Sequence, residues 1–156
     1  MSPNPPPPPA IALEAHLGFW LRYVSNHVSA RFQTLLAERD VSVTEWVALC
    51  TLFSQDTTSH AELIQVLGMT KGAASKVISR LEDKGLVQRQ LAEGKAREQL
   101  LALTGEGRAL TPVLGALAEA NDAHFFAHLP ADERLVLMRT LQALVSHHQL
   151  KTLPSS

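Results

Sequence analysis

The residue types best suited to contact a polyanion are concentrated in one short stretch of the chain. Seven of its 14 Lys and Arg residues lie between Lys71 and Arg97, against three acidic residues, although the whole chain has a net charge of −1. Such a local excess of cations is typical of surfaces that meet nucleic acid. The alternative is an ordinary solvated helix face, and the small residues among the cations favour DNA over it.

A helix expected over residues 71–84 would sort these side chains onto one face. Its apolar residues recur every three or four positions and would pack inward. The opposite face would carry small, hydroxyl and basic side chains, which allow close approach to a major groove. It has no Asn or Gln, so we expect modest direct base readout and a contribution from DNA shape. The candidate DNA-contacting residues are Thr70, as N-cap, and Lys71, Gly72, Ser75, Lys76, Ser79 and Arg80.

A hairpin is expected directly after this helix. Residues 86–91 and 98–103 have the composition of two strands around a polar loop. Arg89 on the first strand, with Lys95 and Arg97 in the loop, could reach an adjacent minor groove or its phosphates. A helix-turn-helix followed by a hairpin with a basic tip is a winged helix. The bland alternative is a hairpin loop with ordinary surface charges.

Helices must hold this unit in place. Ser-x-x-Glu patterns at 42–45 and 59–62 predict reciprocal N-caps, with Thr44 as a competing cap in the first. Gly68 should end the second of these helices in a left-handed conformation. Thr104 should cap a later helix with a kink at Pro112. Besides 71–84, hydrophobic periodicity predicts helices over residues 11–39, 43–54, 60–67, 105–128 and 131–149.

Length and composition fit one compact domain with extensions. The chain has 156 residues, of which 46% are hydrophobic and 19% charged, enough to bury a core. The sequence has a single cysteine and shows neither a membrane-spanning stretch nor a signal peptide, so we expect a cytoplasmic protein. We expect a disordered Pro-rich tail over 1–10, a helical dimerisation region over 11–41 and 105–149, a winged helix-turn-helix DNA-binding domain over 42–104, and a flexible tail over 150–156.

The last two expected helices indicate a homodimer. They carry far more apolar surface than a winged-helix core can cover, and leaving it in water is costly. Two-fold symmetry would then predict a pseudo-palindromic operator in double-stranded DNA, with half-sites about 34 Å apart. The sequence lacks the motifs of phosphate loops, nucleophile elbows and zinc proteases, so neither an enzyme nor a cofactor is expected.

Three segments resemble the MarR (multiple antibiotic resistance regulator) family of winged-helix transcription factors, over about residues 13–149. They are Val43–Leu49, residues 75–87 with Arg89, and Leu103–Gly107. The resemblance implies a mainly α fold with a small β-hairpin wing, an obligate homodimer, and a cytoplasmic repressor released by a small phenolic or lipophilic ligand. One departure is Lys95, which stands where many family wings have an acidic residue two positions before the tip arginine, here Arg97.

The sequence says less about the effector than about the DNA-binding surface. A cleft between the helical region and the winged helix would be lined by Trp20, His27 and Trp46, whose rings could hold an aromatic carboxylate or could simply be core. A metal-responsive member of the same architecture is one alternative, since two histidines at 124 and 128 are four apart, but we expect no metal site. A redox-responsive member, through Cys50, is another. A DNA-packaging protein without sequence preference comes third.

Overall fold

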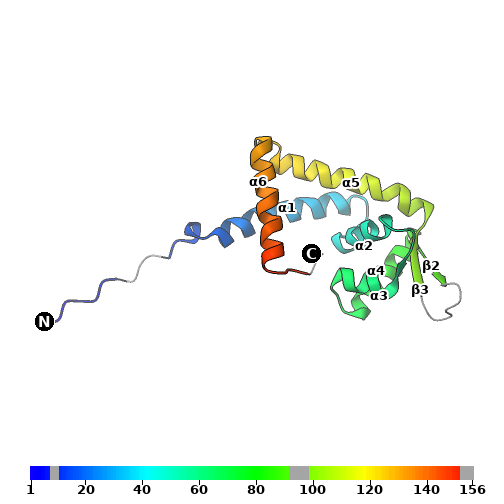
Figure 1. Cartoon of the computed structure of the whole chain (residues 1–156), viewed down its shortest axis with the longest axis horizontal. Helices are drawn as coiled ribbons and strands as arrows, with labels where there is room; N and C mark the ends of the chain where they lie inside the picture. Colours follow the sequence, from blue (N-terminus) through cyan, green and yellow to red (C-terminus); the bar gives the residue numbers. More distant parts are fainter. Residues whose placement is uncertain (8–10, 92–98, 152–156) are drawn as a thin grey trace.

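The computed structural model describes residues 1–7, 11–91 and 99–151. Along these residues the elements are η1 (Leu13–Ala15), α1 (Leu17–Ala37), α2 (Val43–Phe53), β1 (Thr58–Ser59), α3 (His60–Leu67), α4 (Lys71–Asp83), β2 (Val87–Leu91), β3 (Gln99–Leu103), α5 (Gly105–Phe126) and α6 (Ala131–His147). The predicted fold class, a mainly α chain with a winged helix-turn-helix and flanking helices, is confirmed (Figure 1).

Short polar signals in the sequence set where the helices begin. Before each of α2, α3, α4 and α5 a hydroxyl oxygen accepts a hydrogen bond from the backbone N–H three residues later. At α3 the reciprocal bond from the Ser59 N–H to Glu62 is also made, as predicted. At α2 the cap is Ser42 rather than its competitor Thr44. Gly68 ends α3 at φ 62°, a left-handed conformation in which glycine has no steric cost.

The long N-terminal helix predicted over residues 11–39 is wrong in its first turns. A 3₁₀ turn comes first, His16 is extended at φ −109° and ψ 127°, and α1 begins at Leu17. The Trp20 indole N–H donates to the Glu14 carbonyl over 2.9 Å, and a ring nitrogen of His16 lies 3.0 Å from the Ala12 carbonyl oxygen. These side chains satisfy carbonyls that a continuous helix would have used. In the C-terminal part of the chain, α5 and α6 each end two residues before the positions predicted for their C-termini.

The sheet has a third strand that the sequence pattern did not predict. Its order is β1-β3-β2, and both pairings are antiparallel. β1 pairs Thr58 with Leu101, and β2 pairs Val87 with Leu103. Strand β3 is therefore central, and it joins the wing to the residues that lead into α3.

Most of the buried core lies inside the winged-helix unit, between its helices and its sheet. Leu49 of α2, Leu63 of α3, Ile78 of α4 and Leu101 of β3 are fully buried together. α1 and α5 lie against one another along the far side of this unit, and in the view of Figure 1 α6 runs across the direction of α1. In contrast to the core, every residue of α6 is exposed. The winged-helix unit thus has a buried core, whereas the helical region is open, meaning that α6 leaves its residues exposed to solvent.

Candidate nucleic-acid interface

Helix α4 has the two faces that its sequence predicts. Ala74, Val77, Ile78 and Leu81 are all buried in the core. The candidate DNA-contacting residues are on the other side of the helix, where Ser75 is half-buried. The others are exposed: Thr70, Lys71, Gly72, Lys76, Ser79 and Arg80. Thr70 accepts from the Ala73 N–H, which fixes the start of the helix, and its hydroxyl can still donate.

Three cations on α4 are available to an incoming anion. In the part of the chain that the structure describes, Lys71, Lys76 and Arg80 form no ion pair with an acidic side chain. A Cβ built at Gly72 would meet no atom within 4 Å, so this turn of the helix presents little bulk. The positive end of the helix dipole adds to the field at its first turn. The exposed face is therefore cationic and narrow at its N-terminal half.

Arg89 is held in place by two hydrogen bonds within the chain. Its Nε donates to Glu82 Oε1 over 2.6 Å, and its Nη1 donates to Gln99 Oε1 over 2.9 Å. The guanidinium thereby connects the last turn of α4 to both strands of the wing. Its predicted contact with DNA stays a prediction. Lys95 and Arg97, predicted for the wing tip, lie outside the described residues.

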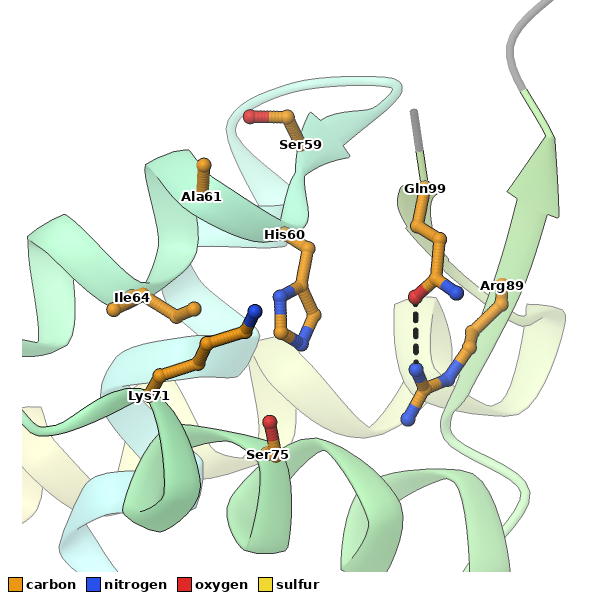
Figure 2. A pocket seen from close by; sticks show the side chains of 8 residues that line it. All are labelled: Ser59, His60, Ala61, Ile64, Lys71, Ser75, Arg89 and Gln99. Carbon is orange, nitrogen blue, oxygen red and sulfur yellow. Dashed lines mark hydrogen bonds between the residues drawn. The ribbon is translucent and has the colours of Figure 1, made fainter. Parts of the chain in front are cut away.

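A hollow of about 780 Å³ opens between α3, α4 and the wing. Figure 2 shows the imidazole of His60 within this hollow, with Lys71 on one side and Arg89 on the other. Partial burial, then the charges of Arg89 and Lys71, lowers the pKa of His60 below its usual 6.5. The sequence interpretation missed His60. The available signal was its place as the first residue of α3, right after the Ser59 cap.

The other end of α4 is fastened by a buried ion pair. Lys84, at the C-cap, donates to Glu45 Oε2 over 2.7 Å and also to the backbone carbonyl oxygen of Asp40. The Glu45 side chain is only 4% exposed. Asp40 has φ 56° in the turn that joins α1 to α2. One lysine thus links the end of α4, the start of α2 and the turn after α1.

Comparison with known proteins identifies this architecture. The MarR family model matches residues 41–98. An HTH-type transcriptional repressor of Mycobacterium tuberculosis is 31% identical over 136 residues, which are 87% of this chain and 98% of the relative. The chain belongs to the MarR family. Within the part of the chain that the structure describes, none of the helices could cross a membrane.

Solved MarR structures have the same fold. One is a MarR mutant from Escherichia coli complexed with operator DNA, with a TM-score of 0.72, 25% identity, and coverage of 83% of this chain and 93% of that one. Another is CouR from Rhodococcus jostii bound to p-coumaroyl-CoA, with a TM-score of 0.73, 25% identity, and coverage of 86% and 95%. These comparisons extend the likeness to the helices outside the winged unit.

The structure of this MarR chain does not bring the three predicted effector-binding residues together. Trp20 and His27 belong to a ring cluster on α1, where His27 stacks on Tyr23 at 5.2 Å. Trp46 on α2 packs edge-on against Phe32, with ring centroids 6.0 Å apart. Their role in binding an effector stays a prediction.

The residues weighed for redox and metal sensing have ordinary surroundings. Burial raises the pKa of the Cys50 thiol to about 11, which disfavours the reactive thiolate. His124 packs edge-on against Phe125. Across the described residues no three His, Cys, Asp or Glu side chains cluster as a metal site would require.

Proposed function

We propose that this protein is a homodimeric transcriptional repressor that binds operator DNA through α4 and the wing, and that a small molecule lowers its affinity for that DNA. The observation that carries the proposal is the outer face of α4. There, small residues and cations that pair with no acidic side chain among the described residues lie along the exposed side of a helix whose other side is buried in the core. The MarR structure with operator DNA supports the same use of this fold. The proposed activity is binding in the cytoplasm, without catalysis.

The apolar surface of α6 supports the homodimer. An isolated helix that packs on nothing is marginal in water, so this surface needs a partner. A second copy of the same chain would supply one and would place two α4 helices on one duplex. The exposed large apolar residues of α6 are Leu135, Val136, Leu137, Met138, Leu141, Leu144 and Val145.

The CoA-ester complex of CouR supports a ligand-responsive repressor. For this chain we keep Trp20, His27 and Trp46 as the proposed ligand contacts. Dimerisation would have to complete a cavity around them, since they lie in two separate ring clusters.

Selection of duplexes from a random library, followed by fluorescence anisotropy, tests the proposal. We expect the affinity for one pseudo-palindromic sequence to exceed that for random DNA by about a thousandfold or more. Lys76→Ala should cost about 1–3 kcal/mol if Lys76 contacts a base, or reduce the salt slope by about one if it contacts phosphate. Arg39→Ala is the matched control, because Arg39 is an exposed cation in the turn after α1. Equal affinity for all duplexes would instead indicate a packaging protein, and unchanged binding by Lys76→Ala would remove Lys76 as a DNA contact.

A further inference from the structure

The hollow beside α4 contains an ionisable group that the proposed DNA contacts do not use. His60 from α3, Lys71 from α4 and Arg89 from β2 all line it, so nitrogen-bearing side chains of three elements face one opening (Figure 2). Ser75, a candidate DNA contact, lines the same hollow. The opening is therefore continuous with the α4 surface that we propose to meet DNA.

The acidic side chains on the surrounding elements accept hydrogen bonds from other groups or lie exposed at the end of α4. The Glu62 carboxylate accepts from the Ser59 N–H over 3.4 Å, and Glu82 accepts from Arg89. Asp83 is exposed at the end of α4, and β3 contributes the neutral Gln99. The charged residues of the loop between the strands lie outside the described residues. Among the described groups, the ring of His60 thus faces two cations.

This arrangement favours the neutral form of His60 in the free protein. Partial burial and the charges of Arg89 and Lys71 each disfavour a further positive charge, and they lower the pKa of His60. A phosphate in the hollow would reverse the balance, because its negative charge would offset both cations and accept a hydrogen bond from the imidazolium. The His60 ring would then gain a proton when DNA binds.

We propose that His60 is a further DNA-contacting residue, which takes up one proton as a backbone phosphate of the operator enters the hollow between α3, α4 and β2. The inference rests on the proposed operator binding. Between the pKa values of the free and bound states, one linked proton makes affinity rise as pH falls, by at most about tenfold per pH unit. Above the higher value and below the lower one, the His60 contribution to pH dependence disappears.

Operator affinity measured from pH 5.5 to 8.5 at constant ionic strength tests this. The wild-type protein should bind more tightly as the pH falls, and His60→Gln should have a flatter profile with nearly wild-type affinity at pH 8.5. His60→Lys, with a fixed charge, should have the same flatter profile and bind at pH 8.5 at least as tightly as wild type. His128→Gln removes an exposed histidine in the turn after α5 and should retain the wild-type profile. Circular dichroism verifies that each variant is folded.

Two results would overturn the inference while leaving operator binding intact. One is a His60→Gln profile as steep as that of wild type. The other is an imidazole NMR resonance of His60, assigned by its loss in His60→Gln, whose pKa does not rise when the operator duplex is added. Failure of the wild-type protein to select any duplex would instead contradict the proposed function itself.

Discussion

Replacing Lys84 by methionine should destabilise the fold by about 2 kcal/mol, because it leaves the Glu45 carboxylate buried without its partner. Removing one member of a buried ion pair typically costs about 3–5 kcal/mol. Lys84 is 25% exposed, so water reaches its side of the pair and the expected cost falls below that range. The bond to the Asp40 carbonyl is lost as well, which frees the turn between α1 and α2.

Arg89→Met provides the comparison. Its ion pair with Glu82 is just as short, at 2.6 Å, but both side chains are about one-third exposed. Exposed pairs contribute about 0.2–1 kcal/mol, so this variant should lose less than 1 kcal/mol. The two substitutions thus separate burial from distance as the source of the energy.

The assay is urea unfolding followed by circular dichroism at one protein concentration, since dimerisation would make stability depend on concentration. Adding Glu45→Gln to Lys84→Met should recover part of the loss, because the buried side chain is then uncharged. Equal losses for Lys84→Met and Arg89→Met, or no recovery in the double variant, would refute the reasoning.

Three more predictions concern the core, the thiol and the open helical region. Gly107→Ala should destabilise the fold by about 1–3 kcal/mol in the same unfolding assay, because the added Cβ would overlap the Leu86 carbonyl oxygen. Gly105→Ala is the control, since a Cβ there has open space and should not destabilise the fold. Equal effects of the two substitutions would contradict this reasoning. At pH 8, Cys50 should react with iodoacetamide about 100-fold more slowly in the folded protein than in the urea-unfolded protein, because burial raises its pKa from 9.0 to about 11. The same rate in both states would show that the thiol is not protected by burial. Leu141→Glu should convert dimers to monomers in light scattering at micromolar concentration, and a persistent dimer would place the interface elsewhere.

Local hydrogen bonding explains which parts of the fold could be predicted from the sequence. The caps at Ser59 and Thr70 and the left-handed Gly68 depend on residues within a few positions of each other, so a short window contains the whole interaction. The extended residue at His16 was missed because apolar residues continue at helical spacing on both sides of it. A two-residue strand such as β1 has too few residues to show any periodicity.

The same distinction between local and long-range interactions applies to the candidate site. Burial on α4 follows from a 3.6-residue period, and the exposed face follows with it. The ion pair of Lys84 with Glu45 spans 39 positions, and only the folded chain brings these residues together. His60 and Arg89 come to line the same hollow in the same way, through the packing of α3 against the sheet. Long-range pairing of polar groups has no periodic pattern in the sequence.

Strand β1 alters the mechanics of the wing. Because β3 is paired on both sides, the hairpin is not free to rotate about its own base. A tilt of the hairpin must either move the segment that leads into α3 or break the pairs at Thr58 and Ser59. A displacement of the segment between α2 and β1 would therefore be transmitted to β2 and β3 through the pairs that Thr58 and Ser59 make with β3.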